Sequence, residues 1–151
     1  MIVEAARRLL PALWAGVLLA VALLAAPSAF AVLPVADAGR VVGRVFAQEA
    51  WASLVLALLL FAVERRRARD AADAGTGSVL STEMLLLLGV VFCTVAGYFA
   101  ILPLLPAAKA GQGALSYGQL HLASVAFFGL KTVLVLVLAW RGVRSPTVPS
   151  S

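Results

Sequence analysis

The chain has 151 residues, of which 63% are hydrophobic and 13% are charged, and its mean hydropathy is +1.04. Soluble domains are about 45–50% apolar and about 25% charged, so a soluble fold of this length cannot bury so much apolar surface, and the solvent of this protein is lipid. The net charge of +5 does not indicate nucleic-acid binding, because the basic residues lie at the ends of apolar runs and not on one polar face. The single Cys93 excludes an internal disulfide and a zinc site built on paired cysteines.

Four apolar runs are long enough to cross a bilayer as helices, since about 20 residues span the hydrocarbon core. They cover residues 9–33, 41–63, 80–102 and 118–140. The sequence therefore predicts an all-α fold, an integral membrane four-helix bundle that forms a single domain over residues 1–144. The remaining residues, 145–151, are predicted to be a disordered tail.

Turn and capping residues mark the boundaries of these spans. Pro27 predicts a kink in the first span, because proline lacks the N–H that a helix interior requires. Asp37 is predicted to cap the N-terminus of the second span, and Ser81 or Thr82 that of the third. The charged and Ala/Gly-rich segment 64–78, between the second and third spans, is expected to be a mobile connection.

The basic residues are distributed unevenly between the two sides of the membrane. Eight of the twelve lie on one side: Arg7, Arg8, Arg65, Arg66, Arg67, Arg69, Arg141 and Arg144. The other side has only Arg40, Arg44 and Lys109. Because loops rich in Lys and Arg stay in the cytoplasm, we expect both termini to be cytoplasmic in a multi-pass protein of the bacterial inner membrane.

The first apolar run has two interpretations. It follows two arginines and ends near Ala29-Phe30-Ala31, which fits the small-x-small pattern of a signal-peptidase site. However, its apolar segment, residues 9–26, is longer than the roughly 7–15 residues of an export signal. It also contains Gly16 in a row of small residues spaced four apart, which suits close helix packing. We therefore expect the first helix to be retained.

Several different short motifs follow one another along the chain. They are Leu13, Trp14 and Gly16, then Ala26, Pro27 and Phe30, then the stretch 39–49, then Tyr98 with Pro103, and finally Leu120, His121 and Ser124. From about Arg8 to Trp140 the chain resembles the bacterial domain-of-unknown-function 4149 family, which is similar to eukaryotic transmembrane protein 205. The resemblance implies a four-helix integral membrane protein that keeps its first helix, and it implies no activity.

Two ionisable side chains lie deep inside the predicted spans, where charge is costly. Glu49 lies about eight residues into the second span, roughly 12 Å deep, and it either pairs with Arg44 or water or serves as a carboxylate for a cation or proton. Lys131 lies close to mid-membrane, and its side chain leans toward the N-terminus of its helix. Our main structural hypothesis is a Glu49–Lys131 pair with His121 nearby. The alternative is a lysine that reaches a water-filled crevice alone or is neutral through desolvation.

Other polar residues share the faces of these helices. His121 and Ser124 lie on the same helical wedge as Lys131, so this stripe is expected to face the bundle interior. His121 is either a packing histidine or a partner that hydrogen-bonds Glu49, and Tyr98 is a further candidate for this intramembrane polar cluster. Metal or heme ligation by His121 is less favoured, because the chain has no second histidine.

Glycines at helical spacing indicate close helix packing. Gly89, Cys93 and Gly97 are spaced four apart in the third span, and Gly16 occupies a similar row in the first. Cys93 is then a small apolar residue within its row.

No catalytic motif is recognisable, so we expect a protein that is not an enzyme and binds no metal or other cofactor. The favoured function is a structural, accessory or assembly component of the membrane. One alternative is an oligomeric transporter or permeation component for an ion, proton or small solute that uses Glu49, His121 and Lys131. Another is a metal- or heme-handling membrane protein. The expected partners are the lipid bilayer and either further copies of the chain or another membrane protein.

Overall fold

The computed structural model describes residues 2–144, and all regular structure within them is helical. The predicted tail over residues 145–151 lies outside the described residues. The elements are α1 (Ile2–Ala20), η1 (Val21–Ala25), α2 (Ala26–Val32), α3 (Val35–Asp73), α4 (Thr82–Thr94), η2 (Val95–Ile101), η3 (Leu102–Leu104), α5 (Leu105–Lys109) and α6 (Tyr117–Arg144). They make four helical segments, each long and apolar enough to cross a membrane. The predicted all-α architecture with four spans is confirmed.

The helices extend beyond the predicted spans, and α3 changes the expected connection most. Segment 64–78 was predicted to be mobile, yet α3 continues through it to Asp73, and the chain turns only after Ala74, at Gly75 with φ of +70°. The prediction is wrong for residues 64–73, because Glu, Arg and Ala are strong helix formers and these residues prolong the helix that precedes them. Residues 74–78 lie outside regular structure, as expected of a connection. Asp37 also does not cap α3: Pro34 is the N-cap, and Asp37 lies in the first turn, where its charge favours the helix dipole.

The third span begins as predicted. Ser81 has extended backbone dihedrals at the N-cap of α4, and its hydroxyl oxygen accepts a hydrogen bond from the backbone N–H of Met84 at 3.3 Å. This contact satisfies one of the free N–H groups at the helix start.

Two helical segments contain π-helical turns just before a proline. The turn η1 precedes Pro27, and η2 precedes Pro103. A proline cannot donate the backbone hydrogen bond that a regular helix needs, so the preceding turn widens. The distortion expected at Pro27 therefore takes the form of a π turn. Both π turns lie toward the end of the bundle that is farther from the N-terminus of α1.

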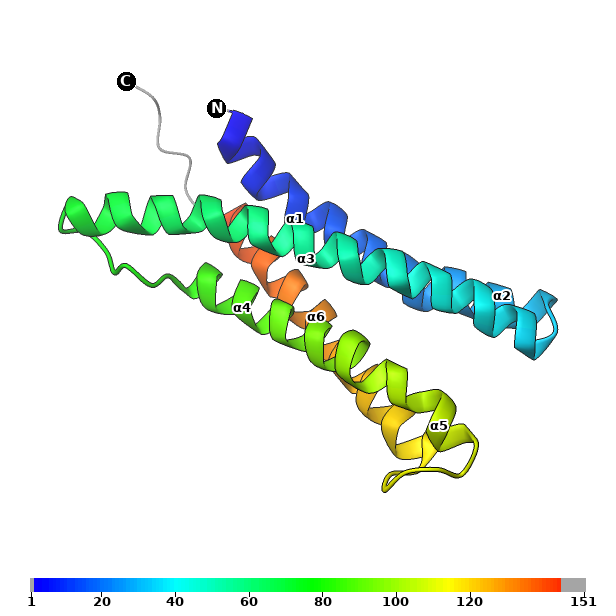
Figure 1. Cartoon of the computed structure of the whole chain (residues 1–151). Helices are drawn as coiled ribbons and strands as arrows, with labels where there is room; N and C mark the ends of the chain where they lie inside the picture. Colours follow the sequence, from blue (N-terminus) through cyan, green and yellow to red (C-terminus); the bar gives the residue numbers. More distant parts are fainter. Residues whose placement is uncertain (1, 145–151) are drawn as a thin grey trace.

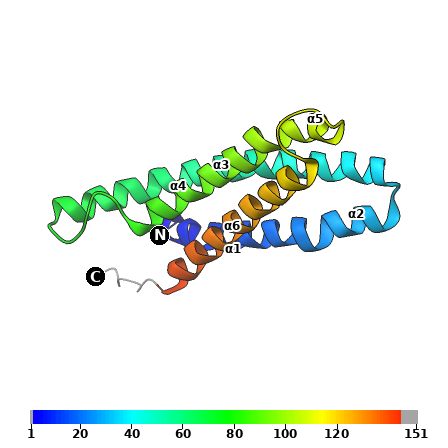
Figure 2. The same ribbon diagram turned by 90° about the horizontal axis from the view of Figure 1, so that it is seen from below.

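The four segments form a ring in which neighbours are α1, α3, α4 and α6, in that order. Figures 1 and 2 show that α1 begins and α6 ends at the same end of the molecule, which we call the terminal end; the other is the open end. The tightly packed core lies between the terminal end and mid-molecule and contains Trp14, Leu18, Leu60, Leu87, Val90, Val135 and Leu138. Exposed Leu, Val and Phe side chains cover the outer surface, as expected in lipid.

Toward the open end the ring separates into two legs. The first leg is α2 with the facing part of α3, and the second is η2, η3 and α5 with the facing part of α6. In Figure 1 these two legs diverge from one another, while all four segments run close together nearer the terminal end. The arrangement therefore resembles a V whose vertex lies near mid-molecule.

Candidate functional site

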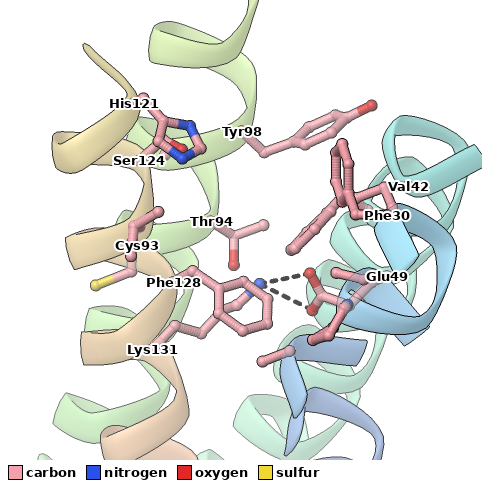
Figure 3. A pocket seen from close by; sticks show the side chains of 16 residues that line it. Phe30, Val42, Glu49, Cys93, Thr94, Tyr98, His121, Ser124, Phe128 and Lys131 are labelled. Atoms are coloured by element: carbon pink, nitrogen blue, oxygen red, sulfur yellow. Dashed lines mark hydrogen bonds and ion pairs between the residues drawn. The ribbon is translucent and has the colours of Figure 1, made fainter. Parts of the chain in front are cut away.

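A cavity of about 450 Å³ lies where the two legs separate (Figure 3). Its apolar lining consists of Ala22, Ala26, Pro27, Phe30, Val42, Phe46, Val125 and Phe128. Its polar and small lining consists of Glu49, Cys93, Thr94, Gly97, Tyr98, His121, Ser124 and Lys131. All five members of the predicted polar cluster therefore contribute to one cavity wall or to its floor.

The floor of the cavity is an ion pair between the two legs. Nζ of Lys131, on α6, donates to Oε1 and Oε2 of Glu49, on α3, at 2.8 and 2.7 Å. Both residues are buried, with 3% and 6% of their surfaces exposed. The predicted pair is thus present, and the alternative pairing of Glu49 with Arg44 does not occur, because Arg44 lies exposed near the start of α3.

Two further side chains extend this pair into a network across three helices. Ser53, one turn along α3 from Glu49, donates its hydroxyl to Oε1 of the carboxylate. Trp14, on α1, donates its indole N–H to the hydroxyl oxygen of Ser53 at 2.9 Å. Ser53 follows Glu49 by four residues and therefore shares its helix face, whereas the sequence analysis did not identify Trp14 as a partner. The available signal was that a tryptophan inside a membrane span needs an acceptor for its N–H.

Aromatic rings surround the ammonium group. The ring of Phe128, one turn from Lys131 on α6, lies with its centroid 4.8 Å from Nζ, which is a favourable cation–π distance. The ring of Phe46, on α3, meets that of Phe128 edge to face at 5.2 Å. Rings from both legs therefore lie beside the charged floor, and Glu49 and Lys131 still line the cavity.

His121 lies apart from the ion pair, near the open end of the cavity, as Figure 3 shows. The expected closeness of His121 to the pair and its hydrogen bond to Glu49 are wrong, because ten residues of α6, roughly 15 Å of helix, separate His121 from Lys131. Its ring instead stacks on Tyr117 at 5.7 Å, and it is exposed. Ser124 and Tyr98 lie in the same upper part of the cavity.

The glycines of the third segment provide close helix contact. A Cβ atom placed on Gly89 would lie 3.0 Å from Cδ1 of Leu134, and one on Gly97 would lie 3.0 Å from Cβ of Phe127. Both neighbours belong to α6, so the row that predicted close approach packs within the chain. Gly16 has no atom of another helix near its missing side chain. The packing expected of Gly16 is therefore not made inside the described part of the chain.

The terminal end is held by ion pairs that the sequence analysis did not anticipate. Glu4, at the start of α1, accepts hydrogen bonds from Arg7 at 2.7 Å and from Arg67, on α3, at 2.8 Å. Glu83, on α4, accepts from Arg141, on α6, at 2.9 Å. Arg7 also donates to Glu64 of α3 at 3.5 Å. The arginines were interpreted only as topology signals, but Arg7, Arg67 and Arg141 also join helices.

The described residues contain no group of three or more His, Cys, Asp or Glu side chains arranged to hold a metal ion. A family model described as a domain of unknown function (DUF4149) matches residues 9–114, which include Glu49 and Tyr98 but end before Lys131. No curated protein and no solved structure matches the chain.

Proposed function

Because the chain belongs to the domain-of-unknown-function family DUF4149, whose description assigns no activity, we propose its function from its own geometry. The protein is a non-catalytic accessory component of the bacterial inner membrane. It holds a cavity between two helical legs, and the Glu49–Lys131 pair joins those legs at the vertex. We call this pair, together with Ser53 and Trp14, the clasp.

The observation that supports this role is that the hydrogen bonds of the buried Glu49 carboxylate are made within the chain. Both carboxylate oxygens of Glu49 accept from Lys131, and one also accepts from Ser53. A general acid or base needs an oxygen or nitrogen that reaches a reacting group. A buried carboxylate that is paired with a lysine of another helix instead favours one arrangement of the helices over others.

The packing beneath the clasp favours an accessory role over transport. Val135 lies one turn beyond Lys131 toward the terminal end and is completely buried, and Leu18 and Leu87 are equally inaccessible beside it. A solute that reached the floor of the cavity would meet this close-packed apolar core. A permeation path would therefore need a second chain or a large rearrangement.

The orientation follows from the positive-inside rule. The terminal end contains eight of the twelve Lys and Arg residues of the chain. We place this end in the cytoplasm, so that the cavity and its legs belong to the outer half of the membrane.

The proposal is tested by the distance between the legs. Nitroxide labels at Val32→Cys on α2 and Leu122→Cys on α6, both exposed, report this separation in a Cys93→Ala background by double electron–electron resonance in nanodiscs. We expect a narrow distance distribution that broadens when Lys131→Met removes the clasp.

A matched label pair at the terminal end is the control. Val3→Cys on α1 and Val143→Cys on α6 are also exposed, and the ion pairs of that end are independent of Lys131. Their distance distribution should stay unchanged. An open-end distribution that is equally narrow with and without Lys131 would contradict the clasp.

A further inference from the structure

The cavity has a lateral mouth between α2 and α6. On the opposite side, Trp51 of α3 and Phe99 of η2 meet edge to face at 5.2 Å and close the gap between the legs. On the mouth side, Phe30 of α2 and Val125 of α6 line the cavity and remain 49% and 52% exposed. All four segments are long and apolar enough to cross a membrane, so an opening between two of them faces lipid. A molecule that enters here must dissolve in the bilayer.

The size and walls of the cavity suit a flat apolar body. Its volume of about 450 Å³ falls within the roughly 300–1,000 Å³ of small-molecule sites. Phe46 and Phe128 form an edge-to-face pair beside the Glu49–Lys131 pair. Phe30 and Tyr98 point into the cavity from opposite legs in Figure 3. Aromatic side chains from both legs therefore offer surfaces on which a ring can pack.

The floor selects for an uncharged head group. Glu49 and Lys131 neutralise one another, so a ligand carboxylate or ammonium would have to separate them and leave one charge buried without its partner. A lysine ammonium has three donors, and Glu49 engages two of them. The third is available to a neutral acceptor such as a carbonyl oxygen.

A second polar position lies above the floor. Ser124 lines the cavity, and its hydroxyl makes no hydrogen bond within residues 2–144; Tyr98 also lines the cavity, but its hydroxyl points toward the first leg in Figure 3. Ser124 precedes Lys131 by seven residues, about 10 Å of helix, and the long lysine side chain leans into this interval. A ring with one acceptor at each end fits between these two polar positions.

We infer that the cavity is a binding site for an uncharged quinone-type amphiphile. One ring carbonyl accepts a hydrogen bond from Lys131, the other faces Ser124, and the apolar tail leaves between α2 and α6 into the lipid. This inference rests on the Glu49–Lys131 pair of the proposed clasp, which keeps the floor neutral and supplies the free donor, and not on the effect of the clasp on the distance between the legs.

The test measures equilibrium binding of a naphthoquinone with a short isoprenoid tail to the full chain in nanodiscs. Val125→Trp fills the mouth from α6, and we expect it to weaken binding at least about tenfold. Val133→Trp is the matched control, because Val133 is 54% exposed on the same helix but does not line the cavity. Phe30→Trp narrows the same mouth from α2 and should reproduce the loss if Val125→Trp does not fold.

Two further probes test the head group. A fatty acid with a tail of similar length introduces a carboxylate, and an alkane of that length has no acceptor; both should bind at least about tenfold more weakly than the naphthoquinone. Absence of saturable naphthoquinone binding, equal loss in Val125→Trp and Val133→Trp, or tighter binding of the fatty acid would each overturn the inference.

The outcomes for the site and for the clasp are separable. If the leg distances depend on Lys131 but the naphthoquinone does not bind, the ligand inference fails and the clasp stands. If the naphthoquinone binds at the mouth and the leg distances do not depend on Lys131, the ligand inference stands and the clasp fails.

Discussion

At the scale of single residues, the clasp depends on two charges that are each unfavourable alone. A charged side chain at mid-membrane costs at least about 2.5 kcal/mol, and removing one member of a buried pair leaves the other without a partner. Glu49 and Lys131 approach each other from helices separated by 82 positions in the sequence. Their energies are therefore coupled, although they belong to different legs.

A double-mutant cycle measures this coupling. We expect Glu49→Gln and Lys131→Met to lower the free energy of unfolding by about 3–5 kcal/mol each, because each leaves one buried charge unpaired. The double variant should recover most of this loss. Thermal unfolding in nanodiscs provides the comparison, with the exposed Arg44→Gln as a control that changes stability by less than about 0.5 kcal/mol. Additive losses in the double variant would show that the two residues do not interact.

At the scale of helices, the two ends of the bundle are held differently. Ion pairs join α1 to α3 and α4 to α6 at the terminal end, whereas the open end lacks such links between the legs among the described residues. A glycine contact brings η2 close to α6 within the second leg, and another brings α4 close to α6 in the tightly packed part of the bundle. Each leg is therefore a packed unit, and the clasp is the polar connection between the two.

Two glycine substitutions distinguish a packed helix face from a lipid-facing one. Gly97→Leu places side-chain atoms where a Cβ already lies 3.0 Å from Phe127, so we expect a loss of about 1–3 kcal/mol in unfolding free energy. Gly16→Leu changes helix propensity in the same way but meets no atom of another helix, and it should leave the stability of the monomer nearly unchanged. Chemical unfolding of both variants makes the comparison. Equal changes in stability would contradict the packing role of Gly97, because leucine is the better helix former at both positions.

At the scale of the whole molecule, the first helical segment is part of the core and of the cavity. Trp14 and Leu18 are buried in the central cluster, and Pro27 and Phe30 line the cavity between the legs. An export signal has no reason to provide either contact. We therefore expect this segment to be a helix of the mature protein.

An intact-mass measurement on protein extracted from its own membrane tests this. We expect the mass to include residues 1–31, because their loss would remove Trp14 from the clasp and one wall from the cavity. A mass that lacks these residues would contradict retention and would leave the remaining three segments without their α1 contacts.

The sequence by itself determined the class of fold, the four spans and the depth of Glu49 and Lys131. Lipid leaves a backbone no hydrogen-bonding partner but itself, so the length and hydropathy of each run decide its helix locally. The same depth argument paired Glu49 with Lys131. The same argument failed for His121, which lies almost three helical turns from Lys131 along α6.

Only the tertiary structure decided which helices are neighbours and which way each face turns. It brought Trp14 to Ser53, turned Gly97 toward α6 and Gly16 toward the outside, and separated the legs to leave a cavity. These outcomes depend on contacts between helices that are distant in the chain. A lipid-soluble helix can rotate about its axis at little cost until such contacts fix it, so hydropathy along one span does not predict them.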